Sequence, residues 1–191
     1  MNEPVTLVTD YILAIASTMF GVLLWRRAVR LWALAFFFTA AGTFFGGTYH
    51  GFGGGAWWKA TVYSIGLASL FLLAGATHNR FVRAIAVIGF VGYAIWMVNH
   101  DDFVYVIIDY GATLIAVTIV QTAAWMRDRA RSAPWVIGSV IVSIIAAAVQ
   151  QAPIPYHNDV YHAIQLVALW LLYRGGTFMT PATERSMIQP M

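Results

Sequence analysis

The chain has 191 residues, of which 60% are hydrophobic and 10% are charged, and its formal net charge is +3 at pH 7. Soluble domains carry about 25% charged residues, so this composition excludes a soluble globular protein and predicts an integral membrane protein. The absence of cysteine excludes disulfides and thiolate-bound metals. The basic residues occupy short loops between apolar segments, which argues against a nucleic-acid partner.

Seven apolar segments follow one another along the chain, and each is close to the roughly 20 residues that cross a bilayer as a helix. We expect these helices at about residues 5–25, 31–54, 57–77, 81–98, 103–126, 134–151 and 158–173. The first segment should be retained as a span, because the N-terminus lacks the positive charge of a cleavable signal sequence. Residues 1–176 then form one all-α seven-transmembrane helix bundle, and residues 177–191 form a short tail.

The basic residues lie almost entirely in alternate loops. Ten of the eleven Lys and Arg residues fall between segments one and two, three and four, or five and six, or follow segment seven, and Lys59 is the exception. Positively charged loops stay in the cytoplasm. We therefore expect the N-terminus outside and the C-terminus in the cytoplasm, most simply in the inner membrane of a bacterium.

This orientation gathers histidines and acids at the outer end of the bundle. They come from five segments and comprise Asp10, His50, His100, Asp101, Asp102, Asp109, His157, Asp159 and His162. His100 and its two acidic neighbours are most simply an external loop. Asp10, Asp109 and His162 lie deeper, where a polar side chain has either a partner in another helix or a function.

Imidazoles of this group could hold a zinc ion. A catalytic zinc takes three protein ligands and keeps a fourth position for water, whose pKa it lowers to about 7. His50, His157 and His162 are the candidate ligands, and Asp109 or Asp159 is the candidate base. His157 and His162 are five residues apart, about 140° around a regular helix, so His157 must lie before the helix begins, with Asn158 or Asp159 as its N-cap.

Other site classes fit the sequence less well. It has no phosphate-binding glycine loop and no Gly-x-Ser-x-Gly elbow. A retinal protein needs a lysine in its last helix, and the single lysine, Lys59, begins the third segment. A haem between His50 and His162 would need deeper ligands. A structural hydrogen bond between helices stays open for both His162 and Asp109.

Two motifs resemble those of a known superfamily. Gly-Gly-Thr-Tyr-His-Gly-Phe at 46–52 closes the second segment, and His-Asn-Asp-Val-Tyr-His-Ala-Ile-Gln at 157–165 opens the seventh. Together with the seven spans they resemble the alkaline ceramidase and progestin/adipoQ receptor superfamily, through a group of bacterial seven-span proteins without a known activity. The resemblance implies an intramembrane zinc that hydrolyses a lipid amide, with His50 and His162 as ligands and His157 as the third.

The chain departs from the superfamily pattern at three places. Gly46 stands where the superfamily has a serine four residues before the histidine of span two, and Asn158 stands where it has the first histidine of span seven. Its early aspartate in span three is missing, since Thr61 and Ser64 occupy that region. Asp10, Asp109 or Asp159 could supply this carboxylate from another helix.

From these residues we expect a zinc-dependent intramembrane hydrolase of a lipid amide or ester, with its site in the outer leaflet. The alternative is a non-catalytic membrane protein that binds a lipid or pigment, or that packs into a larger complex as a subunit. A metal-free bundle in which His162 is hydrogen-bonded to Asp109 or Asp10 would favour the alternative.

Overall fold

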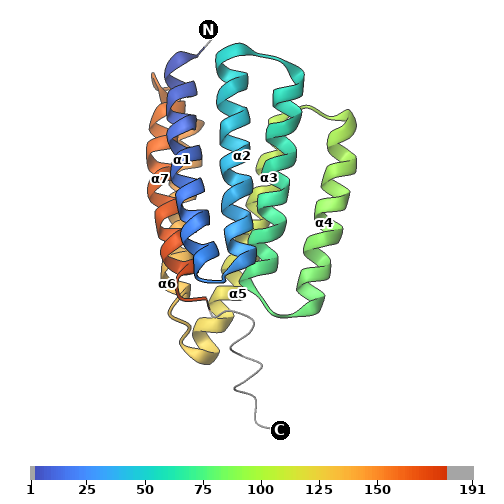
Figure 1. The fold of residues 1–191 in the computed structure, drawn as a ribbon, viewed down its shortest axis with the longest axis vertical. Helices are drawn as coiled ribbons and strands as arrows, with labels where there is room; N and C mark the ends of the chain where they lie inside the picture. Colours follow the sequence, from blue (N-terminus) through green and yellow to red (C-terminus); the bar gives the residue numbers. More distant parts are fainter. Residues whose placement is uncertain (1–2, 180–191) are drawn as a thin grey trace.

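The computed structural model describes residues 3–179, and its regular structure over that range is entirely helical (Figure 1). The helices are α1 (Pro4–Arg26), α2 (Arg30–Phe52), α3 (Gly55–Ala76), α4 (Arg80–Asn99), α5 (Phe103–Asp128), α6 (Ala133–Gln150) and α7 (His157–Gly176). Six of them, α1 to α6, are long and apolar enough to cross a membrane. α7 is less apolar because polar residues fill its first turns. The predicted all-α architecture is confirmed, and residues 180–191 of the predicted tail lie outside the described range.

The helices run side by side, and six of them close into a ring (Figure 1). Along this ring α1 packs on α2, α2 on α3, α3 on α5, α5 on α6, α6 on α7, and α7 returns to α1. α4 stands outside the ring and packs on α3, so most of its surface is exposed. The contact between α1 and α7 therefore joins the first helix to the last and closes the ring of helices.

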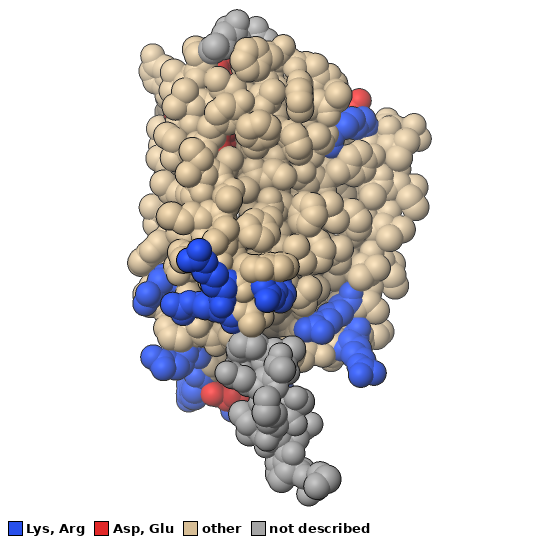
Figure 2. Space-filling model, viewed as in Figure 1, with Lys and Arg blue, Asp and Glu red and all other residues tan. Residues whose placement is uncertain are grey.

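The two ends of the bundle differ in charge. Figure 2 shows Lys and Arg side chains gathered around one end. We call this the arginine end, and it holds the loops at 27–29, 77–79 and 129–132. The opposite end, which we call the histidine end, holds the N-terminus and the loops at 53–54, 100–102 and 151–156. Lys59 lies near the histidine end, where it pairs with Asp101.

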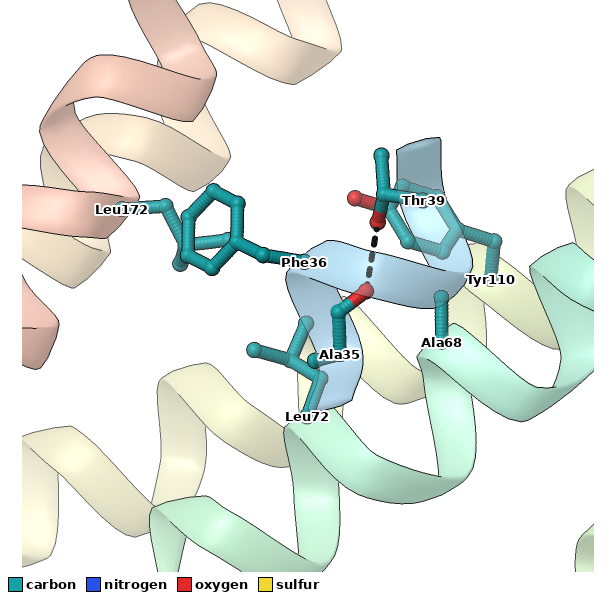
Figure 3. A pocket seen from close by; sticks show the side chains of 7 residues that line it. All are labelled: Ala35, Phe36, Thr39, Ala68, Leu72, Tyr110 and Leu172. Atoms are coloured by element: carbon teal, nitrogen blue, oxygen red, sulfur yellow. Dashed lines mark hydrogen bonds between the residues drawn. The ribbon is translucent and has the colours of Figure 1, made fainter. Parts of the chain in front are cut away.

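Large apolar side chains fill the interior. Trp32 and Phe36 of α2, Leu13 and Leu24 of α1 and Val117 of α5 are all almost fully buried. The cavity in Figure 3, lined mainly by α2 and α3 together with Tyr110 of α5 and Leu172 of α7, has a volume of about 10 Å³. A single water needs about that much space, so this central cavity is too small for a pigment or a lipid chain.

Glycines allow α1 and α2 to approach closely, as expected for membrane helices with small residues at their interface. A Cβ atom at Gly47 would lie 2.8 Å from the Cβ of Asp10 and 3.2 Å from the carbonyl oxygen of Leu7. A Cβ atom at Gly51 would lie 2.7 Å from the side chain of Leu7. This close contact places the polar residues of α1 directly beside the end of α2.

We predict that Gly47→Ala lowers the apparent melting temperature in detergent, because the added methyl group collides with α1; overpacking of this kind costs about 1–3 kcal/mol. Gly89→Ala on α4 is the matched control, since no atom lies within 4 Å of a Cβ atom there. The control should leave the melting temperature unchanged or slightly raise it. Equal effects of the two variants would contradict the packing described for α1 and α2.

Candidate functional site

Polar side chains line the seam between α1 and α7 at the histidine end. Thr9 and Asp10 lie three and four residues after Thr6, so both are neighbours of Thr6 on the surface of α1. Asp159 and His162 are three residues apart and share one face of α7. These faces meet because α1 and α7 pack together. We call these five residues the seam cluster.

His162 lies at the centre of the seam cluster. Its Nδ1 is 2.7 Å from the hydroxyl oxygen of Thr9, and its Nε2 is 3.3 Å from Oδ1 of Asp10. The side chains of His162 and Asp10 are only 9% and 7% exposed. One imidazole therefore connects a hydroxyl group to a carboxylate inside the bundle.

The proton on Thr9 has several acceptors within reach. The hydroxyl donates to the carbonyl oxygen of Thr6 at 3.1 Å and to Oδ1 of Asp159 at 3.4 Å, and Nδ1 of His162 is nearer than either. The hydroxyl of Thr6 also donates to Asp159 at 3.4 Å. If Nε2 of His162 carries its proton toward Asp10, Nδ1 is free to accept from Thr9. In that tautomer His162 can act as a base toward the Thr9 hydroxyl.

Asp10 also lies beside the end of α2. A Cβ atom at Gly46 would lie 4.0 Å from Oδ2 of Asp10 and 3.5 Å from the methyl carbon of Thr61. Gly46 and Thr61 are residues at which the chain departs from the ceramidase-like pattern. The carboxylate beside them comes from α1, so Asp10 is the one of the three candidate acids that lies against both α2 and α7.

The two acids predicted as bases are placed differently. Asp159 belongs to the seam cluster through its contacts with Thr6 and Thr9. Asp109 lies on α5 and faces Ser69 of α3, and its buried Oδ2 has no hydrogen-bond partner in the described part of the chain. The contacts of Asp109 thus lie on α3, whereas His162 is paired with α1.

The predicted position of His157 was wrong. α7 begins at His157 itself, and its N-cap is Tyr156, whose φ of 58° lies in the left-handed region. The carbonyl of Tyr156 accepts from the amides of Asp159 and Val160, so the helix starts earlier than expected. His157 and His162 consequently point about 140° apart around one helix. Nδ1 of His157 is buried and has no partner within residues 3–179.

His50 is held by the N-terminal segment. Its Nδ1 lies 3.0 Å from Oε2 of Glu3, and the amide of Glu3 donates to the carbonyl oxygen of His50 at 3.2 Å. Both ring nitrogens of His162 already have partners. Within residues 3–179 no group of three or more His, Asp or Glu residues is arranged to hold a metal ion. These residues do not fit the predicted three-histidine zinc site.

The remaining polar residues of the histidine end have local structural roles. The ring of His100 stacks on that of Trp96, and its Nδ1 lies 2.8 Å from the carbonyl oxygen of Trp96. Asp102 caps α5 by accepting from the amide of Val104. Asp101 pairs with Lys59. These contacts agree with a loop at residues 100–102, and its position outside the membrane stays a prediction.

Thr6 and Thr9 were not expected in the site from the sequence, and Asp10 was expected only as an alternative acid. The three residues repeat a helical spacing within an otherwise apolar segment. This pattern matches the spacing of Asp159 and His162 in the last segment. The polar face of α1 and the polar face of α7 lie at similar distances from the same end of the bundle. This similarity is the signal from which the contact between the two helices could have been predicted.

A family model described as a family of unknown function, DUF6962, matches residues 5–181. No curated protein matches the chain. No solved structure matches it either.

We predict that Asp10 and His162 are energetically coupled. Asp10→Ala and His162→Ala should each lower the free energy of unfolding by about 1–3 kcal/mol, because each leaves a buried partner unpaired. The double variant should lose less than the sum of the single losses, by about 0.5–3 kcal/mol. Denaturant unfolding in detergent micelles measures these values. Asp10→Ala combined with Asp101→Ala should be additive, since the two acids share no partner, and additivity in the first pair would contradict the coupling.

Proposed function

The chain belongs to the family of unknown function DUF6962. From the geometry of the seam cluster, together with the resemblance to the ceramidase-like superfamily, we propose that it is an intramembrane hydrolase of a lipid amide or ester. His162 acts as the general base, and Asp10 orients and stabilises its imidazole. The site is the seam cluster at the histidine end. Membrane lipids are the substrates, since the surrounding surface of the bundle is apolar.

The observation that carries this proposal is the position of His162 between Thr9 and Asp10. A helix contact alone needs one hydrogen bond, whereas a hydroxyl, an imidazole and a carboxylate in sequence are the arrangement that activates an oxygen nucleophile. Burial strengthens the interaction of the imidazole with the carboxylate. Thr9 and Asp159 are half-buried and so give access to the cluster from outside.

We propose further that the chain crosses the membrane seven times, with the histidine end outside. The gathering of basic residues at the arginine end supports this orientation. In α7 the polar residues lie in the first turns, where a span meets the interface, and the segment from Leu166 to Tyr173 is apolar. The seam cluster then lies in the outer leaflet.

A zinc ion bound by the three histidines remains a separate prediction, and the contacts of the seam cluster do not support it. His50 and His162 would both have to leave their present partners to bind one ion together. We therefore derive no step of the reaction through a metal.

The second candidate is a non-catalytic lipid-binding protein or a subunit of a membrane complex. The pairing of His162 with Asp10 favours it, because the seam cluster fastens α1 to α7 and closes the ring even without any chemistry. An apolar groove of about 600 Å³ along α1 and α2 could accept a lipid chain, and exposed Ile15, Met19 and Phe44 help to line it.

Hydrolysis by the purified protein distinguishes the two candidates. In liposomes that contain a ceramide or a phosphatidylcholine with a fluorescent acyl chain, we expect release of the fluorescent fatty acid from at least one lipid. His162→Gln should lower the rate by about 10²–10⁴-fold, the contribution typical of a general base. Glu3→Gln, at the same end but outside the seam cluster, is the control and should retain the rate. No release from either lipid would reject the hydrolase and leave the second candidate.

The absence of cysteine makes the orientation directly testable. We predict that a membrane-impermeant maleimide added to intact cells labels Gln151→Cys, because this exposed residue lies at the histidine end. Arg26→Cys, exposed at the arginine end, should react only after the cells are opened. The reverse pattern would invert the proposed topology.

A further inference from the structure

We propose that Thr9 is the nucleophile of the hydrolysis and that the reaction requires no metal ion. This inference rests on the proposed function and assigns the reacting atom within it. It concerns a residue that neither the histidine motifs nor the ceramidase-like pattern selects.

The position of the hydroxyl group is the first argument. Oγ1 of Thr9 lies 2.7 Å from Nδ1 of His162, within the distance over which a base takes a proton directly from a nucleophile. Among its contacts this is the shortest, since the carbonyl oxygen of Thr6 is at 3.1 Å and Oδ1 of Asp159 is at 3.4 Å. The hydroxyl is thus held on three sides and aligned with the imidazole.

Exposure is the second argument. His162 and Asp10 are buried, whereas Thr9 is half-buried, so Thr9 is the least enclosed of the three residues. The buried Asp10 stays shielded from water on the far side of the imidazole. Its carboxylate can then stabilise the positive charge that the ring acquires when it takes the proton.

The occupied ring nitrogens of His162 are the third argument. A zinc ligand must present a free nitrogen lone pair to the metal. Nδ1 faces Thr9 and Nε2 faces Asp10, so a zinc ion shared with His50 would have to displace one of these contacts. The same two contacts that disfavour zinc are those that a metal-free base requires.

The reaction then proceeds in two balanced steps. Oγ1 of Thr9 attacks the acyl carbon of the lipid while its proton passes to Nδ1 of His162. The bond from the acyl carbon to the leaving nitrogen or oxygen breaks, the leaving group takes that proton, and the acyl chain stays on Thr9 as an ester. In the second step a water molecule attacks this ester, His162 takes the proton of the water and returns it to Oγ1, and the free fatty acid leaves.

Asp159 is a positioning residue in this scheme. Its Oδ1 lies 3.4 Å from the hydroxyls of both Thr6 and Thr9 and fixes the two side chains on one face of α1. Asp159→Ala removes this acceptor and should lower the hydrolytic rate, whereas Asp159→Asn keeps an oxygen acceptor and should restore part of it.

Acyl trapping on the protein tests the nucleophile. The protein is mixed with ceramide or phosphatidylcholine that carries a fluorescent acyl chain, quenched in acid and mapped by peptide mass spectrometry. We expect the acyl mass on the peptide that contains Thr9. Thr9→Ser should retain hydrolysis within about tenfold because it keeps the hydroxyl, and Thr9→Val, of similar shape, should lose at least about 10²-fold. Melting temperatures show whether each variant remains folded.

The outcomes separate this inference from the function on which it rests. If Thr9→Val hydrolyses lipid at the unaltered rate while His162→Gln does not, Thr9 is not the nucleophile and the hydrolase stands. If dialysis against EDTA and 1,10-phenanthroline abolishes hydrolysis and zinc restores it, the metal-free mechanism is overturned. Retained hydrolysis after chelation, with the acyl group on Thr9, supports both parts. If the unaltered protein hydrolyses neither lipid, the proposed function and this inference fail together.

Discussion

The contact between His162 and the first helix is the interaction on which the rest of this structure depends. It lies on the seam where the last helix of the chain returns to the first, so it closes the ring of helices. In hydrocarbon an unpaired imidazole or carboxylate is costly. Each of these groups therefore needs a partner in the bundle. At the seam, Thr9 lies on one side of the imidazole of His162 and Asp10 lies on the other. The same contact that closes the fold also assembles the candidate site.

This arrangement depends on the small residues at the end of α2. Gly47 leaves the space that the side chain of Asp10 occupies, because a Cβ atom at this position would lie 2.8 Å from the Cβ of Asp10. Gly47 thus has a more specific role than close packing alone, since it lets a carboxylate from α1 lie beside both α2 and α7. At Gly46 a Cβ atom would make only ordinary contact, 4.0 Å from Oδ2 of Asp10.

The helices were predictable from the sequence, whereas the pairing of their polar faces was not. Apolar segments of sufficient length and alternate basic loops predict membrane helices directly, because both are local properties of the chain. The partner of His162 depends on which helices lie side by side, and nothing local distinguishes Asp10 from Asp109. His157 illustrates a second limit. The N-cap of α7 is Tyr156, two or three residues before the expected Asn158 or Asp159, and this shift turns His157 away from His162.

The seam cluster holds more hydrogen-bond acceptors than its structural role requires. A clamp between α1 and α7 would be complete with Thr6 bonded to Asp159 and His162 in contact with Asp10. Thr9 adds a hydroxyl whose one proton faces three acceptors, the nearest of which is the imidazole. A hydroxyl in this position can lose its proton to His162 while its oxygen stays held in place. The carbonyl oxygen of Thr6 is an ordinary acceptor for a threonine in a helix, whereas His162 and Asp159 are two side-chain bases beside one half-buried hydroxyl, as the proposed proton transfer requires.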